Sequence, residues 1–210
     1  GVASGSILDG FEPFVVIVQE QTVCTNESCK SPLQPDFKFC DKCGTPTEFG
    51  KYSNFLDAAK KAEQQSAFDD AANQYVQAAQ RRVNDKRKSV ALLGAGRNYL
   101  QLKKFDEAGR ELEKAKKLDP LNGDIFVSLA HLALDGENNA SKAEAACNEA
   151  DRLSKRPELT AEMRGDIAFA RKAYPDALKA YTTAEGVDPS SAKLNYRIGL
   201  CLIAANAEFS

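Results

Sequence analysis

From residue 54 to the end of the chain, apolar residues recur at helical spacing among Ala, Lys, Glu, Gln and Leu. This periodicity predicts a series of amphipathic helices. Nearer the start, a β-branched run from Val15 to Val18 follows Pro13 and predicts one strand, at residues 14–20. Residues 23–49 are rich in turn formers. The pattern therefore predicts a small N-terminal unit that joins a helical domain near residues 46–53.

The helical part repeats itself. Short helix starts recur along the chain, and their last alanines are 37, 35 and 34 residues apart: Phe68-Asp69-Asp70-Ala71, Phe105-Asp106-Glu107-Ala108, Ala140-Ser141-Lys142-Ala143 and Tyr174-Pro175-Asp176-Ala177. Repeats of this length indicate stacked helical hairpins, because a single hairpin cannot bury its apolar face alone. The paired acidic residues fall in the first turns of second helices. There their negative charges interact favourably with the positive end of the helix dipole.

Residues 89–122 resemble the tetratricopeptide repeat through Leu92, Ala95, Gly96, Tyr99, Ala108, Leu112, Ala115 and Pro120. Residues 158–191 resemble it through Gly165, Ala168, Ala177, Tyr181, Ala184 and Pro189. The resemblance extends over residues 52–207. It implies a mainly α fold, an α-α superhelix of about four hairpins at 52–88, 89–122, 123–157 and 158–191, with a final helix at 192–207. The third unit carries one extra residue around Asp135–Asn139.

Four of the six cysteines form two short pairs, Cys24 with Cys29 and Cys40 with Cys43. Cysteine pairs on turns can place four thiolates around a Zn²⁺ ion, and four protein ligands leave no open coordination position, so the metal is expected to be structural. Disulfides, free thiols or a rubredoxin-like iron site are the alternatives. Gly44 is expected to take a positive φ and turn its amide toward a thiolate.

The stretch Phe37–Gly44 looks like the second knuckle of a zinc ribbon, whereas the first cysteine pair has four intervening residues instead of the usual two. We therefore expect a small β zinc ribbon, with its preceding strand, at residues 14–49. Phe37 and Phe39 are expected to form its small core. We expect the ribbon to pack on the first hairpin as a rigid N-terminal cap. Residues 1–13 are expected to be a cloning scar, a flexible lead or the edge of a longer protein.

Charge and composition count against several classes of function. The net charge is −2, which weakens any case for a nucleic-acid or membrane binder, and no apolar run approaches the ~20 residues of a spanning helix. The cysteine pattern indicates a reducing compartment, and we expect the cytoplasm. Cys147 and Cys201 are expected on packing faces. His131 is the only histidine, and no nucleophile can be assigned beside it, so no enzyme is expected.

The tetratricopeptide resemblance also implies a concave groove. Its register places on the groove wall Lys60, Val90, Leu93, Arg97, Gln101, Val127, His131, Asp166, Phe169 and Tyr196, with one cationic and one anionic end. Such a groove suits an extended or helical peptide; a half-buried structural role for His131 is the alternative. In relatives that clamp acidic chaperone tails, the matching positions here hold Leu56, Lys60, Gly94, Asp124 and Ser128. Only Lys60 fits, which disfavours that ligand.

The favoured hypothesis is a non-enzymatic adaptor that binds a protein or peptide in its groove. Nucleic-acid binding through Lys30, Lys38 and Lys42 of the ribbon is one alternative. Another is an accessory region of a larger protein whose N-terminal domain is missing. The basic run Arg81–Lys88 is expected to be a solvated inter-repeat loop. The final helix has an apolar face that needs cover, so we expect self-association or truncation there.

Overall fold

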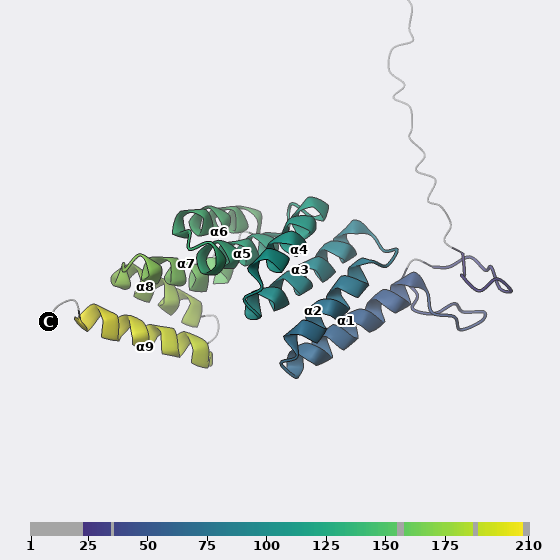
Figure 1. The fold of residues 1–210 in the computed structure, drawn as a ribbon, viewed down its shortest axis with the longest axis horizontal. Coiled ribbons are helices and arrows are strands. Elements are labelled where there is room, and N and C mark those ends of the chain that lie inside the picture. The colour runs from purple at the N-terminus through teal and green to yellow at the C-terminus, as the bar shows by residue number, and fades with distance from the viewer. Residues whose placement is uncertain (1–22, 35, 155–157, 187–188, 208–210) are drawn as a thin grey trace, which may run out of the picture.

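The computed structural model describes residues 23–34, 36–154, 158–186 and 189–207. The lead at residues 1–13 and the strand expected at residues 14–20 lie outside the described residues. Within these ranges the chain forms an α-helical array that extends away from a small cysteine-containing unit. Figure 1 shows this unit at one end of the molecule and the last helix at the opposite end.

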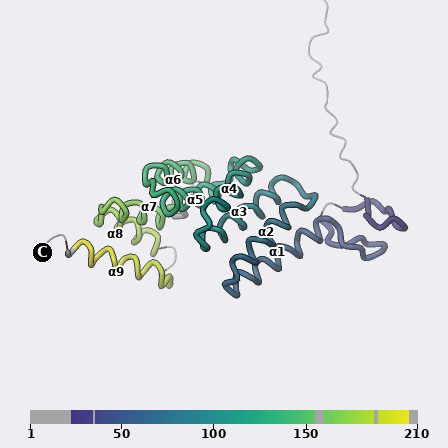
Figure 2. Tube along the Cα trace, in the orientation of Figure 1, coloured from purple at the N-terminus to yellow at the C-terminus, as the bar shows by residue number. Residues whose placement is uncertain are grey.

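The helices follow one another as antiparallel hairpins (Figures 1 and 2). In chain order they are α1 (Glu48–Gln64), α2 (Phe68–Ala79), α3 (Asp85–Gln101), α4 (Phe105–Leu118), α5 (Gly123–His131) with the π-helical turn η1 (Leu132–Gly136), α6 (Ala140–Ser154), α7 (Glu158–Ala170), α8 (Tyr174–Glu185) and α9 (Ala192–Ala207). The described residues thus confirm a mainly α superhelix of four hairpins and a final helix.

Small residues let the helices of each hairpin approach closely. The four alanines whose spacing marks the repeats are all fully buried: Ala71, Ala108, Ala143 and Ala177. In the second hairpin, a Cβ atom at Gly96 would come within 2.7 Å of the Leu112 side chain. In the fourth, a Cβ atom at Gly165 would collide with the Tyr181 ring. A large side chain on the second helix therefore requires a glycine on the first.

Two helices begin earlier than the sequence predicted. Helix α1 begins at Glu48 instead of at residue 52, because the Thr47 hydroxyl accepts a hydrogen bond from the Gly50 amide at 2.9 Å. Helix α3 begins at Asp85, where the Asn84 side chain accepts from the Arg87 amide at 2.9 Å. The prediction of a loop over residues 81–88 was therefore wrong for its second half, which forms the first turn of α3.

The extra residue of the third repeat is accommodated by a π-helical turn. The amide of Glu137 donates to the carbonyl oxygen of Leu132, five residues earlier, at 3.2 Å. A π turn adds one residue to a helix without ending it. Ala143 can therefore take its buried position in α6, despite the longer connection.

The cysteine-containing unit has little regular structure. Its described residues contain two isolated antiparallel bridges, Val23 with Pro32 and Phe39 with Pro46, and no strand. The unit contacts the helical array through the Thr47 amide, which donates to the carbonyl oxygen of Lys38 at 3.0 Å. That carbonyl also lies where a Cβ atom at Gly50 would be. The first turn of α1 therefore lies directly against the unit.

None of the helices in the described ranges combines the length and the apolar character that a membrane crossing requires.

Candidate functional site

Four thiols come together in the N-terminal unit. The Sγ atoms of Cys24, Cys29, Cys40 and Cys43 all lie within 4.8 Å of one another. Cys24 Sγ is 3.5 Å from Cys43 Sγ, and Cys29 Sγ is 3.8 Å from Cys40 Sγ. A tetrahedral ion with zinc–sulfur distances of about 2.3 Å requires sulfur atoms about 3.8 Å apart. All six cysteines are free thiols, so these four could hold a metal ion.

The second cysteine pair forms a compact turn. The amide of Cys40 donates to the carbonyl oxygen of Thr45 at 2.9 Å, and the amide of Gly44 donates to the carbonyl oxygen of Cys40 at 2.9 Å. Gly44 has φ +69°, the conformation that its position after the cysteine pair predicts. Its amide points at a carbonyl oxygen instead of the expected thiolate, because it closes the turn.

The first pair forms a similar turn despite its longer spacing. Lys30 has φ +43°, in the place that glycine takes in the second turn. Its amide donates to the carbonyl oxygen of Asn26 at 3.1 Å, so Asn26 holds the turn position that Cys40 holds in the other. Cys24 lies two residues earlier and donates its amide to Ser31 at 2.8 Å. The longer spacing of the first pair therefore places Cys24 two residues earlier in the chain, whereas the turn itself has the same hydrogen bond as the second turn.

Each turn also places a hydroxyl beside its second cysteine. Ser31 Oγ lies 3.1 Å from Cys29 Sγ, and Thr45 Oγ1 lies 3.1 Å from Cys43 Sγ. Hydrogen bonds from the side chain and backbone of Thr45 lower the pKa of Cys43 to about 6. A hydroxyl that donates to sulfur favours the thiolate, which is the form that binds a metal.

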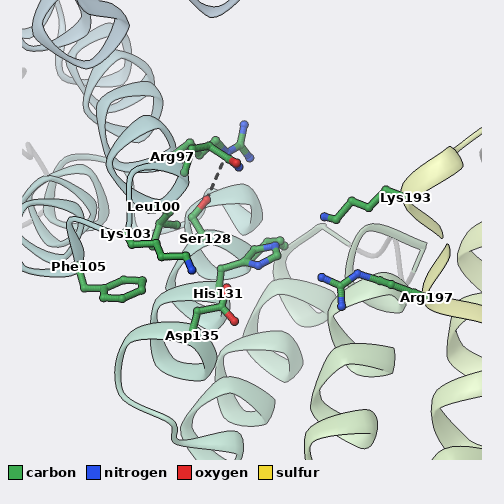
Figure 3. A pocket seen from close by; sticks show the side chains of 11 residues that line it. Arg97, Leu100, Lys103, Phe105, Ser128, His131, Asp135, Lys193 and Arg197 are labelled. Atoms are coloured by element: carbon green, nitrogen blue, oxygen red, sulfur yellow. Dashed lines mark hydrogen bonds between the residues drawn. The ribbon is translucent and has the colours of Figure 1, made fainter. Parts of the chain in front are cut away.

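A second site is a cavity of about 830 Å³ between the helices (Figure 3). It is lined from α3 and the turn that follows, from α4, α5 and η1, and from α9: Arg97, Leu100, Gln101, Lys103, Phe105, Val127, Ser128, His131, Asp135, Lys193 and Arg197. Figure 3 shows Lys193 and Arg197 reaching from α9 toward His131. The last helix therefore faces α3 and α5 across the cavity.

Three of the four cations of this cavity form ion pairs with carboxylates. Arg97 Nε donates to Ser128 Oγ at 3.2 Å, and the Arg97 guanidinium lies 3.8 Å from Asp124. On the other side, Lys193 Nζ lies 2.7 Å from Glu162. Lys103, in the turn after α3, has no ion-pair partner among the described residues. The cavity therefore presents positive charge, and one of its lysines is free to pair with a ligand.

The anionic end that we expected in the groove is covered. Asp166 is 7% exposed, accepts a hydrogen bond from the Tyr181 hydroxyl at 2.7 Å and forms an ion pair with Arg197. Burial raises its pKa, which the bond from Tyr181 and the charge of Arg197 oppose. Asp166 therefore joins α7, α8 and α9 and does not line the cavity.

His131 lies at the centre of the cavity wall. Its side chain is half-buried, and burial lowers its pKa, although the nearby charge of Asp135 opposes this effect. The imidazole is therefore neutral at pH 7, where it can donate and accept hydrogen bonds. The site thus combines fixed cations with one neutral polar ring.

The structure brings four of the ten expected groove residues into this cavity: Arg97, Gln101, Val127 and His131. Leu93 is buried, and Phe169 is half-buried with its ring 5.4 Å from that of Tyr174. Lys60, Val90 and Tyr196 are exposed but do not line this cavity. The register missed Lys103, Lys193 and Arg197. For the latter two, their i, i+4 spacing on one face of the final helix was the available signal.

Comparison with known proteins identifies the fold. Neither a protein-family model nor a curated protein matches the chain. Among solved structures, the first TPR of Spaghetti (RPAP3) bound to the HSP90 peptide SRMEEVD is 24% identical, with a TM-score of 0.50, over 59% of this chain and 97% of that one. A MamA RS-1 ArsTM double mutant is 14% identical, with a TM-score of 0.53, over 73% and 84%.

A thermophilic TPR protein of Thermus thermophilus, TTC0263, is 14% identical, with a TM-score of 0.50, over 72% of this chain and 99% of that one. At these identities the likeness shows the fold alone. Together with the hairpin order, it shows that this chain has a tetratricopeptide-like helical repeat fold. This is the fold that the repeat spacing predicted.

Proposed function

We propose that this chain is a non-enzymatic adaptor that holds a segment of a partner protein in the cavity between α3, α5 and α9. The observation that carries the proposal is the cavity itself, which is open enough for a peptide and is lined by side chains from separate repeats. The binding of an HSP90 peptide by one structural neighbour supports this role. We place the adaptor in the cytoplasm, in keeping with six free thiols.

The charge of the cavity favours an acidic segment. Four cationic side chains line it, against the single carboxylate of Asp135: Arg97, Lys103, Lys193 and Arg197. Carboxylates of a ligand would add to the ion pairs of three of these cations and would give Lys103 a partner. The tail-clamp positions do not supply this charge, because Lys60 is the one cation among them. We therefore propose a site farther toward α9 than that clamp.

An array of synthetic 12-residue peptides that range from strongly acidic to strongly basic tests this function. We expect retention of the intact, metal-loaded chain to increase with the negative charge of the peptide. Arg97→Glu and Lys103→Glu should each weaken binding about fivefold or more. Lys179→Glu, an exposed charge reversal on α8 outside the cavity, is the matched control. Equal retention of all peptides, or no effect at Arg97, would contradict the proposal.

We also propose that the metal is zinc and that its role is structural. Cysteine sulfurs in a closed set of four suit zinc, and they leave no position for a substrate or water. The N-terminal unit has no strand among its described residues, so its fold depends on the ligand set. Zinc would stabilise the turns that hold Lys38 and Thr47 against α1.

One observation favours a second function, the binding of single-stranded nucleic acid. Phe37 and Phe39 are 50% and 51% exposed, so the expectation that they form a core was wrong. They flank Lys38, and exposed aromatic rings beside a cation can stack on bases. Fluorescence anisotropy with labelled single-stranded RNA tests this function. Salt-dependent binding that is lost in Phe37→Ala/Phe39→Ala would support it, and no binding at low salt would exclude it.

A further inference from the structure

The last helix has two different faces. Its inner face is packed on α8, where Leu194 is 3% and Cys201 is 1% exposed. Its outer face is apolar and open: Tyr196 is 67%, Leu202 is 47% and Ile203 is 68% exposed. Exposed apolar side chains at this density on one helix indicate a surface that another element covers.

The register of the repeats indicates what kind of element fits the outer face. Gly199 follows Gly165 by one 34-residue repeat, and it is the counterpart of Gly96 in the second hairpin. Leu112 lies against Gly96, and Tyr181 lies against Gly165. At Gly199, nothing lies within 4 Å of the position of a Cβ atom. The face therefore has the recess for a large side chain from a second helix, and no described residue fills it.

We propose that this recess accepts α9 of a second copy of the chain, so that the protein forms a dimer through its last helix. The outer face carries both complementary parts. Ile203 is a large exposed side chain, and it lies one helical turn, about 6 Å, from the recess at Gly199. In an antiparallel pair of α9 helices around a two-fold axis, Ile203 of each copy meets Gly199 of the other.

The charges of α9 favour a second copy over an acidic or basic partner. Its two charged residues are Lys193 and Arg197, and both form ion pairs with carboxylates of α7. The outer face is therefore uncharged, so two copies can meet without repulsion and without burying an unpaired charge. Lys193 and Arg197 point into the cavity, so this pairing leaves the peptide site open.

Sedimentation equilibrium of the metal-loaded, 210-residue chain tests the proposal. We expect a monomer–dimer equilibrium that favours the dimer by about 100 μM, and Ile203→Glu should weaken it at least tenfold, because it places a charge in the contact. Leu121→Glu is the matched control, because Leu121 is 72% exposed and lies between α4 and α5. It should dimerise like the wild type.

Cross-linking keeps the test decisive if Ile203→Glu fails to fold. Mixing Gly199→Cys chains with Ile203→Cys chains should give a disulfide-linked dimer, whereas Leu121→Cys chains should give none. A monomeric wild type at about 100 μM would overturn the proposal and leave the face to a helix from elsewhere in the protein or from a different protein. A dimer that Ile203→Glu does not weaken, or the absence of the mixed disulfide from a dimeric protein, would also overturn it.

Discussion

The guanidinium of Arg87 lies 4.3 Å from the centre of the Phe49 ring. Phe49 is in the first turn of α1, and Arg87 is in the first turn of α3. The same guanidinium forms an ion pair with Asp36 of the cysteine-containing unit, and the Arg87 carbonyl accepts a hydrogen bond from the Tyr52 hydroxyl at 2.8 Å. One residue therefore connects the N-terminal unit to two helices.

We expect Arg87→Ala to lower the free energy of unfolding by about 1–2 kcal/mol, mainly through loss of the contact with the Phe49 ring. The ion pair should add little, because Asp36 is 71% exposed. Asp36→Ala should therefore cost less than about 0.5 kcal/mol. Urea denaturation of the metal-loaded protein measures both values, and Lys86→Ala serves as the exposed control. An equal decrease in the free energy of unfolding for Asp36→Ala and Arg87→Ala would contradict this account.

The proposed zinc site predicts a defined stoichiometry. Elemental analysis should find one zinc ion per chain, and Cys43→Ser should lose it. Cys147→Ala should keep it, because Cys147 is buried in the helical array and burial raises its pKa to about 11. After a chelator removes the metal, a thiol reagent should modify four cysteines quickly and spare Cys147 and Cys201. Equal reactivity of all six thiols would show that the four clustered cysteines do not differ in accessibility from Cys147 and Cys201.

The hydroxyl beside Cys43 predicts a smaller effect on the same site. Thr45→Val keeps the shape of the side chain and removes the hydroxyl 3.1 Å from the Cys43 sulfur. We expect zinc affinity to fall about 10–100-fold, as for other residues that support a metal ligand. Competition with a coloured chelator measures the affinity. Thr182→Val, on the exposed surface of α8, should leave it unchanged.

Close packing of the fourth hairpin predicts a large effect of a single methyl group. Gly165→Ala should lower the free energy of unfolding by about 1–3 kcal/mol, because the new Cβ atom collides with the buried Tyr181 ring. Gly109→Ala is the matched control, since the nearest atom to its Cβ is a Leu132 methyl group at 3.4 Å. That variant should be as stable as the wild type or up to about 1 kcal/mol more stable.

The single histidine predicts a pH dependence of stability. Burial lowers the pKa of His131 in the folded state below its ordinary value of about 6.5, so the unfolded chain binds the proton more tightly. Stability should therefore be lost as the pH falls from about 6.5 through the lower folded pKa, by at most about 1.4 kcal/mol per pH unit.

His131→Asn should lack this dependence, because it removes the proton-binding group. The difference in urea unfolding between wild type and variant, measured between pH 7.5 and 5.5, isolates the effect from proton binding at the cysteines. A difference that does not change with pH would show that burial does not alter the histidine.

The sequence was sufficient to predict the helical array because the repeat spacing reports directly on buried contacts. Ala108, Ala143 and Ala177 recur in the sequence because each lies where two helices touch. Helix starts were less predictable. Thr47 and Asn84 act as N-caps because the backbone amides that follow them point toward their side chains. A single polar residue in the sequence does not reveal this backbone conformation.

The candidate site was predicted less completely, since its residues depend on contacts between distant repeats. The register places Asp166 on the groove wall, but it does not show that Arg197, 31 residues later, covers it. Lys103 lies in the turn after α3. The register assigns only helical positions to the groove wall, so it could not predict this residue. The grouping of the four cysteines was predictable, because two short cysteine pairs are typical of the ligands of one metal ion.

The π-helical turn at Leu132–Gly136 also bears on how this chain can change over evolution. Because the inserted residue is absorbed within a single turn, Ala143 and Cys147 of α6 still pack in one core cluster with Ala130 of α5. A one-residue change of length in this turn should therefore leave the packing of α5 on α6 intact.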